Sequence, residues 1–368
     1  MSVAAPVLEP GATIGILGSG QLGRMLALAA ARLGFKCHIF APDRDSPAFD
    51  VVRESTRADY DDEQALARFA ESVDVVTYEF ENIPAETAAF LAPLVPVLPD
   101  PRILATTQDR IAEKDFIASL GIGTAPYAAV ATSAELSAAL ERIGRPAVLK
   151  TRRFGYDGKG QAAIARDAAA EAAWQDVGPQ PSILEAFVPF VREVSVVAAR
   201  AADGTVECFD LTENEHRDHI LKVSRAPAAI PDALAEQACA IAEKIANALG
   251  YVGVLAVEMF VLADPAGPKV LVNEIAPRVH NSGHWTLDGA SISQFEQHIR
   301  AIAGWPLGKP VRHGEVTMTN LIGDEINDYE QWLTVPGATV HLYGKGPARP
   351  GRKMGHVTQV GAIPPKNA

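Results

Sequence analysis

The first hundred residues alternate between short apolar runs and helix-forming segments, and this alternation constrains the fold more than any other feature. Residues 13–18 (TIGILG), 36–41 (KCHIFA) and 74–79 (DVVTYE) are predicted to be buried strands. Between them, residues 21–34 (QLGRMLALAAARLG) predict a helix that ends at a glycine, and residues 62–73 (DEQALARFAESV) predict a second helix. Strands that alternate with helices in this way predict an α/β fold with a doubly wound parallel sheet.

Length and proline content divide the chain into regions. With 368 residues the chain is long for one hydrophobic core, so two or three domains are expected. Prolines between residues 93 and 101 predict a border near residues 93–105. We therefore expect a Rossmann-like domain over residues 1–105, a second α/β domain over residues 106–310 and a small β-rich region over residues 311–368.

The second region carries its own strand signals. A helix is predicted over TQDRIAEKDFIASLG, before the first of these strands. The predicted strands are PAVLK (146–150), SILEAF (182–187), EVSVVAAR (193–200), VGVLAVEMFVL (252–262) and KVLVNEIA (269–276). Because only ADPAGP separates the last two, they are expected to form an antiparallel hairpin.

Charge and cysteine usage narrow the class of protein. The formal net charge is −12, which argues against general binding to nucleic acid or to an anionic membrane surface. Cys37, Cys208 and Cys239 lie far apart in the sequence in apolar surroundings, so they are expected to be small core residues of a protein from a reducing compartment. No cationic signal segment and no membrane-spanning apolar run is evident, and a cytoplasmic protein is expected.

A glycine motif follows the first predicted strand. In GILGSGQLG, Gly18, Gly20 and Gly23 fit the pattern G-x-G-x-x-G at the start of a helix, where free backbone N–H groups can bind an anion. The motif alone leaves open a dinucleotide site, a mononucleotide phosphate site or a tight turn. The second strand ends at Ala41 without the acidic residue that binds a dinucleotide's ribose, because Asp43 lies beyond Pro42. A dinucleotide site is therefore disfavoured.

A second glycine-rich segment, RFGYDGKGQ (153–161), follows the strand that ends at Lys150. Its three glycines make the segment deformable enough to fold over a triphosphate, and Lys150 supplies a fixed charge for phosphoryl oxygens. The P-loop pattern G-x-x-x-x-G-K-[ST] is absent. On its own such a segment is more often a solvated hairpin, so its interpretation depends on residues elsewhere.

Two glutamates interrupt the predicted hairpin. If its turn centres near residue 265, Glu258 lies opposite Val272, and Glu274 lies one diagonal step away, roughly 7–8 Å between Cβ atoms. Two buried carboxylates on one face need a cation or a proton between them. Mg²⁺, completed by Asn273 and phosphate oxygens, suits this set of oxygen ligands. The alternative is that each glutamate pairs with an arginine in an ordinary ion pair.

Polar residues follow directly after this hairpin. In APRVHNSGHWT, Arg278, His280 and Asn281 could polarise a small oxyanion, whereas His284 more simply satisfies backbone groups. A zinc site is disfavoured, because no thiolate is near and the intervening residues break any helix. Further on, YGKGPARPGRKMG (343–355) holds four cations and no acid, which favours binding of a phosphate monoester.

Together these stretches resemble the ATP-grasp carboxylate–amine ligases and, among them, the N5-carboxyaminoimidazole ribonucleotide synthetase family of bacterial purine biosynthesis. The resemblance covers nearly the whole chain, through GILGSGQLGRML, TYEFENIP, TQDRIAEKDF, LKTRRFGYDGKGQ, NEIAPRVHNSGHWT and the basic loop before GHVTQVG. It implies an ATP-grasp fold in which residues 106–310 include a lid subdomain at about 125–190. The family pattern is broken at Ala186, where a charged residue is usual, and at Ser19, where a glycine is frequent.

The resemblance also implies a reaction and its cofactors. Bicarbonate attacks the γ-phosphate of ATP to give carboxyphosphate, and carboxyphosphate, or CO₂ released from it, is captured by the exocyclic amine of 5-aminoimidazole ribonucleotide. ATP and Mg²⁺ are required, and a homodimer is expected. The alternatives are a related ligase for another ribotide, a nicotinamide-dependent dehydrogenase and a non-catalytic nucleotide-binding protein. The last two leave Glu258 and Glu274 without a role.

The family motifs imply a role for individual residues of this chain, and the first glycine motif becomes a site for the ribotide phosphate. The ATP-binding residues would be Arg110, Lys150, Gly155, Tyr156, Asp157, Gly158, Lys159, Gly160, Gln161, Glu185, Ala186, Phe187, Val188, Glu193, His216, Asn273 and Glu274. The catalytic residues would be Tyr156, Asp157, Lys159, Arg278, His280 and Asn281. The ribotide would bind Ser19, Gln21, Leu22, Glu79, Arg278, Lys345 and Arg352, and Mg²⁺ would bind Glu258 and Glu274.

Overall fold

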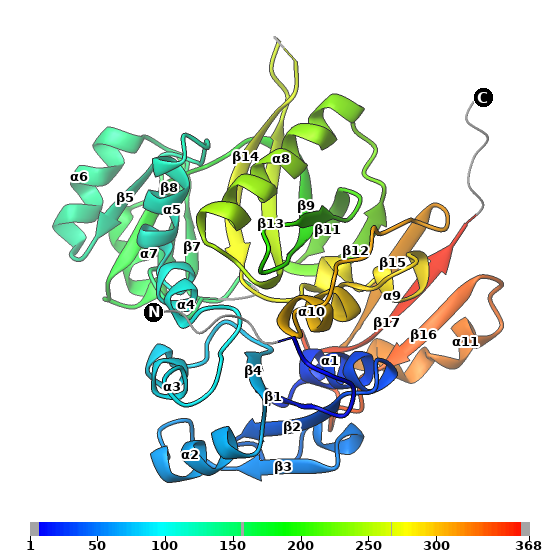
Figure 1. The fold of residues 1–368 in the computed structure, drawn as a ribbon. Helices are drawn as coiled ribbons and strands as arrows, with labels where there is room; N and C mark the ends of the chain where they lie inside the picture. Colours follow the sequence, from blue (N-terminus) through cyan, green and yellow to red (C-terminus); the bar gives the residue numbers. More distant parts are fainter. Residues whose placement is uncertain (1–6, 156–157, 266, 362–368) are drawn as a thin grey trace.

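The computed structural model describes residues 7–155, 158–265 and 267–361, which form three β-sheets with helices packed on them (Figure 1). The N-terminal sheet is parallel, with strand order β3-β2-β1-β4. Its strands are β1 (Thr13–Leu17), β2 (Lys36–Ala41), β3 (Glu54–Arg57) and β4 (Val75–Tyr78). The surrounding helices are α1 (Gln21–Arg32), η1 (Phe49–Val51), α2 (Glu63–Glu71), α3 (Ala85–Leu91) and α4 (Pro101–Thr107). The predicted parallel α/β sheet is confirmed, with β3 as an additional edge strand.

The second sheet is small and antiparallel, with strand order β5-β8-β6-β7. Its strands are β5 (Tyr127–Val130), β6 (Ala147–Thr151), β7 (Gln161–Ile164) and β8 (Ser182–Ala186). Helices α6 (Ser133–Ile143) and α7 (Ala170–Val177) cover it and share one apolar core with it, which includes Leu149 and Trp174. The glycine-rich segment connects β6 to β7, so it lies at one end of this sheet.

The largest sheet runs β14-β13-β9-β11-β12-β15-β17-β16, and β10 pairs with β9. Its strands are β9 (Phe190–Arg200), β10 (Val206–Cys208), β11 (Thr212–Arg217), β12 (Ile220–Ala226), β13 (Gly253–Leu262), β14 (Lys269–Ala276), β15 (Val316–Ile322), β16 (Ala338–Leu342) and β17 (Lys353–Val360). The predicted β13–β14 hairpin is confirmed. The C-terminal strands extend this sheet through pairing of β15 with β12.

Alternating side chains of the large sheet contribute to two cores. The remaining helices are α5 (Arg110–Ser119), α8 (Asp232–Ala248), η2 (Asn281–Gly283), α9 (Thr286–Gly289), α10 (Gln294–Ile302), η3 (Gly323–Asp328) and α11 (Glu330–Leu333). On β9, Val194 and Val196 pack in the core that includes α8. Val197 points the other way, into a core that also holds Phe295 of α10 and Leu26 of α1. Helix α10 therefore joins the N-terminal sheet to the large one.

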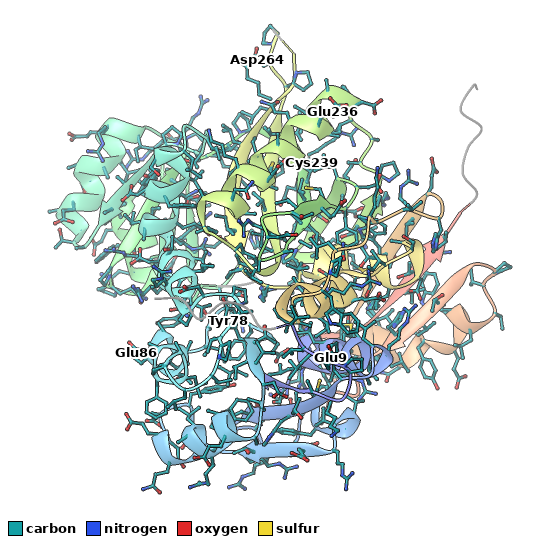
Figure 2. All side chains as sticks on the ribbon, viewed as in Figure 1. Glu9, Tyr78, Glu86, Glu236, Cys239 and Asp264 are labelled. Carbon is teal, nitrogen blue, oxygen red and sulfur yellow. The ribbon has the colours of Figure 1, made fainter. Side chains whose placement is uncertain are left out.

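The three cysteines are free, and each is a partly buried residue that packs against an apolar core, as expected. Cys239 lies on α8, where Figure 2 labels it, and the Sγ of Cys208 lies 4.0 Å from its carbonyl oxygen. Two cysteines that are distant in sequence are thus neighbours in space. None of the helices within the described ranges has the length and apolarity needed to cross a bilayer.

Candidate active site

The residues expected to bind ATP surround one cavity of about 420 Å³ between the small sheet and the large sheet. Its lining includes residues from β6 and β8 on one side and from β9, β13 and β14 on the other. Those predicted from the sequence are Arg110, Lys150, Gly158, Lys159, Gln161, Glu185, Ala186, Phe187, Val188, Glu193, His216, Glu258, Asn273, Glu274, His280 and Asn281. Gly155 lines a smaller adjoining cavity of about 70 Å³. Gly160 lines neither cavity, and Tyr156 and Asp157 lie outside the described residues.

The two interrupting glutamates are closer than predicted. Glu258 pairs directly with Glu274 in the β13–β14 ladder, and not with Val272. The prediction missed the partner of Glu258 by two residues. The hairpin pairs Met259 with Val272 and Leu262 with Lys269, which is one residue from the predicted register, and a β-bulge that inserts Asn273 between Glu274 and Val272 adds the second. Both carboxylates therefore lie side by side, with Asn273 next to them, at the lining of the cavity.

Each glutamate has a cationic or donor partner. Glu274 accepts from Arg110 at 2.8 Å, and an oxygen of Glu258 lies 2.9 Å from Nε2 of His280. Burial favours the neutral acid, yet the imidazole of His280 holds the pKa of Glu258 below its usual range. The alternative prediction, that each glutamate pairs with an arginine, therefore holds for Glu274 and not for Glu258. Both partners are themselves expected site residues.

A third acid, Glu185, is shared by two lysines. Glu185 of β8 lies 2.8 Å from the ammonium group of Lys150 and 3.3 Å from that of Lys114. Burial opposes ionisation, but these ammonium groups lower the pKa of Glu185 to about 2. Lys114 also donates to the carbonyl oxygen of Asn273 at 3.2 Å. The same lysine thus contacts the small sheet and the strand that carries Glu274.

Helix α5 holds the outer edge of β14. The side chain of Glu113 accepts from the backbone N–H of Ile275 at 2.8 Å, next to the carbonyl that Lys114 binds. Burial, together with the nearby charge of Glu274, raises the pKa of Glu113 to about 8. Residues 110, 113 and 114 lie on one face of α5 because helical neighbours recur at three and four residues. This face fixes the bulged strand from the side opposite β13.

One part of the cavity is lined by aromatic and aliphatic side chains. Phe190 stacks on Phe260 with ring centroids 4.7 Å apart, and both line the cavity with Val188. His216 lies 3.1 Å from Glu193. Burial lowers the pKa of this histidine, but its interactions with the carboxylate of Glu193, together with the charge of Glu258, outweigh burial, so the pKa of His216 is raised. The cavity therefore has an aromatic end and a charged end.

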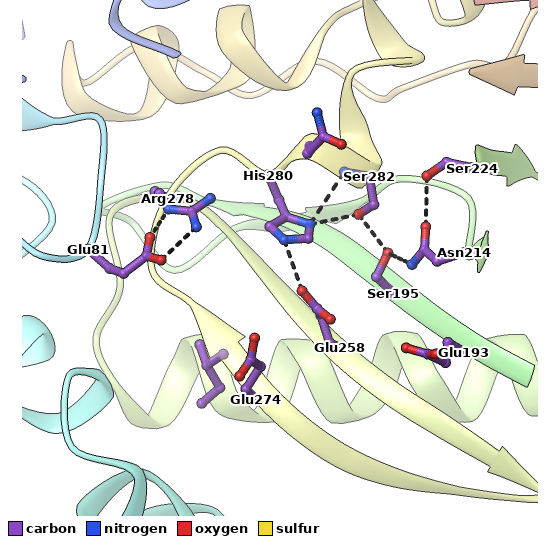
Figure 3. Close-up of polar contacts among 12 residues, drawn as sticks. Glu81, Glu193, Ser195, Asn214, Ser224, Glu258, Glu274, Arg278, His280 and Ser282 are labelled. Atoms are coloured by element: carbon purple, nitrogen blue, oxygen red, sulfur yellow. Dashed lines mark hydrogen bonds and ion pairs between the residues drawn. The ribbon is translucent and has the colours of Figure 1, made fainter. Parts of the chain in front are cut away.

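The loop after β14 lies at the charged end, as Figure 3 shows. Arg278 forms a two-fold ion pair with Glu81, a residue of the N-terminal region that sequence reasoning did not single out. Asn281 exchanges hydrogen bonds with Asn320. His284 is fully buried and lies 3.0 Å from the side chain of Gln294. The expectation that His284 satisfies backbone groups was wrong, because its partner is the side chain of Gln294.

The residues expected to bind the ribotide lie outside both cavities, apart from Arg278. Glu79 is buried and accepts from the backbone N–H groups of Gly20 and Gly23. The first glycine motif thus binds a carboxylate of its own chain at the start of α1. Ser19 donates to Asp43 at 2.8 Å, and Leu22 packs in the apolar core. Gln21 is the first residue of α1. Lys345 donates to the carbonyl oxygen of Lys353 at 2.8 Å, and Arg352 donates to the carbonyl oxygen of Pro347 at 3.3 Å.

Three family models match successive parts of the chain. Residues 11–108 match the ribonucleotide synthetase preATP-grasp domain, residues 115–295 the ATP-grasp domain, and residues 316–364 the phosphoribosylaminoimidazole carboxylase C-terminal domain. An N5-carboxyaminoimidazole ribonucleotide synthase from Brucella melitensis biotype 1 is 52% identical to this chain, over 96% of the chain and 97% of that protein. The chain belongs to the N5-carboxyaminoimidazole ribonucleotide synthase family.

Further relatives of the synthase family extend this finding. The bifunctional purine synthesis protein purC/E of Dictyostelium discoideum is 48% identical over 97% of the chain, which spans 38% of that longer protein. The ADP complex of an N5-carboxyaminoimidazole ribonucleotide synthetase superposes with a TM-score of 0.93 at 42% identity, over 97% of this chain and 94% of that one. An Aspergillus clavatus synthase in complex with ADP and 5-aminoimidazole ribonucleotide superposes with a TM-score of 0.90 at 31% identity. The superposition covers 96% of this chain and 95% of that one. The predicted family, the ATP-grasp fold and the class of ATP-dependent ligase are confirmed.

Sequence reasoning missed the stacked pair Phe190 and Phe260 in the cavity lining and three charged residues near it. Lys114 and Glu113 resemble ordinary surface residues of a charged helix, yet both are buried. Their spacing from Arg110, at three and four residues, is the one signal that could have placed them on the same face. Glu81 lies within TYEFENIP, and no local pattern indicates that it meets Arg278.

Proposed function

We propose that this protein uses ATP and bicarbonate to carboxylate the exocyclic amine of 5-aminoimidazole ribonucleotide, with Mg²⁺ as cofactor. The observation that carries the proposal is the direct pairing of Glu258 with Glu274 at the charged end of the cavity, beside Lys150 and the glycine-rich segment. A non-catalytic nucleotide-binding protein has no need of such a pair. A nicotinamide-dependent dehydrogenase is incompatible with the family.

The donor set fits a magnesium ion. Glu258, Glu274 and Asn273 offer oxygen ligands only, which Mg²⁺ prefers. Among the described residues no group of three or more histidine, cysteine or acidic side chains could hold a metal, so phosphate oxygens and water would complete the coordination. When bound, Mg²⁺ would supply positive charge against the phosphate chain of ATP.

Different residues of the cavity would bind the adenine, the ribose and the phosphates of ATP. The adenine would occupy the aromatic end near Phe260, with its polar edge toward the backbone of residues 185–188. Glu193 and His216 lie where they could bind the ribose hydroxyls. Lys150 and Arg110 would exchange their carboxylate partners for phosphate oxygens and stabilise charge on the transferred phosphoryl group. The glycine-rich segment would close over the phosphates and exclude water.

The acceptor half of the site would use the loop after β14 and the C-terminal basic loop. Arg278, His280 and Asn281 would hold bicarbonate and then carboxyphosphate as hydrogen-bond and charge donors. Because Glu79 already accepts from Gly20 and Gly23, a ribotide phosphate at that motif would compete with a carboxylate. We therefore assign the phosphate to Lys345 and Arg352, and the ribose hydroxyls to Glu79. A homodimer is expected from the family.

Release of ADP tests the proposed function directly. ADP is measured with ATP and Mg²⁺ alone, with bicarbonate added, with the ribotide added, and with both. We expect full turnover only when bicarbonate and 5-aminoimidazole ribonucleotide are both present, and none when EDTA removes Mg²⁺. Equal turnover with another amine or without bicarbonate would move the protein to a different ATP-grasp reaction.

A further inference from the structure

Asn320, a fully buried residue of β15, binds the side chain of Asn281 through two hydrogen bonds. Its Nδ2 donates to Oδ1 of Asn281 at 2.5 Å, and its Oδ1 accepts from Nδ2 of Asn281 at 3.1 Å. Nδ2 of Asn320 also donates to the backbone carbonyl oxygen of Leu221 on β12 at 2.9 Å. The two amide groups therefore form a closed pair that joins β12, β15 and η2.

The carbonyl oxygen of Leu221 determines how both amides are turned. A carbonyl oxygen can only accept, so the atom of Asn320 that faces it must be the nitrogen. The Asn281 atom bonded to that same nitrogen must then be the oxygen, and Nδ2 of Asn281 donates to Oδ1 of Asn320. Neither amide can turn over alone, because two donors and two acceptors would then face each other.

Asn320 is the fixed member of this pair. It lies on β15 between β12 and β17, opposite His356 in the β15–β17 ladder. Its backbone carbonyl oxygen accepts from the buried ammonium group of Lys222 at 2.7 Å. Asn281 instead begins the three-residue helix η2 and is only partly buried, at the lining of the cavity of about 420 Å³. The strand therefore determines where the amide of Asn281 lies.

We propose that Asn320 is a positioning residue, which fixes the Asn281 amide at the place where a bound oxyanion would meet it. Stabilisation of an oxyanion depends on polar groups that are held in position before the ligand arrives, and an amide that can rotate or turn over loses this advantage. The pairing of β15 with β12 thereby gains a role in the site, because a strand of the C-terminal region supports the loop after β14. The identity of the oxyanion, bicarbonate or carboxyphosphate, rests on the function proposed above.

Asn320→Asp tests this role with almost no change of side-chain volume. A carboxyl group carries at most one hydrogen, so it cannot donate both to Leu221 and to Asn281. The Asn281 amide should leave its place or turn over, and we expect the KM for bicarbonate to rise about 10–100-fold, as is typical when a residue behind a site is changed. The KM for ATP should stay near its original value. An equal rise in both KM values would overturn the positioning role.

Two further variants separate positioning from a loss of stability. Asn320→Ser has a single donor and a shorter side chain, and it provides the same test should Asn320→Asp fail to fold. Met318→Ala is the matched control, because it removes a buried core side chain from the same strand. The control should lower the melting temperature and leave the KM for bicarbonate unchanged. A rise in that KM for Met318→Ala as large as for the Asn320 variants would contradict the proposal.

A double-mutant cycle shows whether Asn320 acts through Asn281. Asn281→Ala alone should raise the KM for bicarbonate, because it removes the amide that Asn320 positions. Adding Asn320→Asp to Asn281→Ala should then cause little further rise, since residues that act through one another are not additive. Effects that multiply would mean that Asn320 acts by another route, and the inference would fail.

The position of Asn281 can also be determined without turnover. Crystal structures of the unmodified protein and of Asn320→Ser should show the Asn281 amide paired with residue 320 in the unmodified protein and displaced in the variant. An Asn281 amide that keeps its place in the variant overturns the inference, whatever the enzyme catalyses. Turnover of the unmodified protein that does not depend on bicarbonate would instead overturn the proposed function and leave the positioning of Asn281 intact.

Discussion

At the scale of single residues, the charged side chains of the site already have partners of opposite charge. Glu274 binds Arg110, and Glu185 binds Lys150 and Lys114. A bound nucleotide would replace carboxylates as the partners of these cations, and a divalent ion would replace cations as the partner of the carboxylates. The site therefore avoids isolated buried charges before its ligands arrive, which would otherwise be costly.

Glu274→Gln tests the role of one carboxylate in this exchange. Glutamine keeps the shape of glutamate but loses the charge that a magnesium ion needs. Turnover should therefore fall more than about 100-fold, which exceeds the loss of activity usual when a residue that only supports a metal ligand is changed. Calorimetry should show weaker binding of Mg²⁺ to the enzyme–ADP complex. The matched control is Glu213→Gln, which neutralises an ion pair with Arg192 that does not line the cavity. Near-normal turnover of Glu274→Gln would remove Glu274 from the metal site.

At the scale of elements, the glycine-rich segment fits against the turn between β11 and β12. A Cβ atom added to Gly158 would lie 2.5 Å from the Cβ of His219, and Gly158 has a φ of +76°. Asp218 and His219 form this turn with φ values of 50° and 64°. Both the backbone angle and the close approach therefore require glycine at position 158.

Gly158→Ala should consequently impair closure of the segment over ATP. We expect the KM for ATP to rise about tenfold or more, because a non-glycine residue must both adopt a strained angle and displace the turn. Gly178→Ala is the matched control, since Gly178 has a φ of +80° but its added Cβ would meet only an ordinary contact at 3.5 Å. Adding His219→Gly to Gly158→Ala should restore part of the affinity. Equal KM values for the two alanine variants would exclude the steric contact as the cause.

Some strands and strand pairings could be predicted from the sequence, and others could not. The β13–β14 hairpin was predicted within one residue, because its apolar strands flank a short proline-containing turn. The partner of Glu258 was wrong by two residues, since the sequence does not fix the exact centre of the turn and a bulge at Asn273 has no signature in an alternation pattern. The joining of β15 to β12 was not predicted, because periodicity does not identify a distant partner. Single polar residues such as Ser195 and Asn214 gave no sign of the buried hydrogen bond that joins their side chains.

At the scale of the whole molecule, one buried histidine connects the N-terminal sheet to the large sheet. His298 of α10 lies 2.8 Å from the hydroxyl of Thr77 on β4, and its Nδ1 accepts from the backbone N–H of Val254 on β13 at 3.1 Å. Because that N–H can only donate, Nδ1 is unprotonated and Nε2 donates to Thr77. The contact between the two sheets therefore depends on a neutral imidazole.

This dependence predicts how stability changes with acidity. Burial lowers the pKa of His298 from its ordinary value of 6.5 to about 3. Between those values the unfolded chain binds a proton at this residue and the folded chain does not, so the contribution of His298 is complete above pH 6.5 and is lost as the pH falls toward 3. Through His298 alone, the free energy of unfolding should fall by up to about 1.4 kcal/mol for each pH unit of acidification in this range.

Urea unfolding between about pH 7.5 and pH 5 measures this slope, and His298→Gln isolates the part that belongs to His298. Glutamine can accept from Val254 and donate to Thr77 without titrating, so the variant should lose less stability than the unmodified protein as the pH falls. Some dependence should remain, because burial also lowers the pKa values of His284 and His356. Parallel stability curves for the two proteins would show that His298 does not titrate on unfolding, and the sheet contact would then be insensitive to acid.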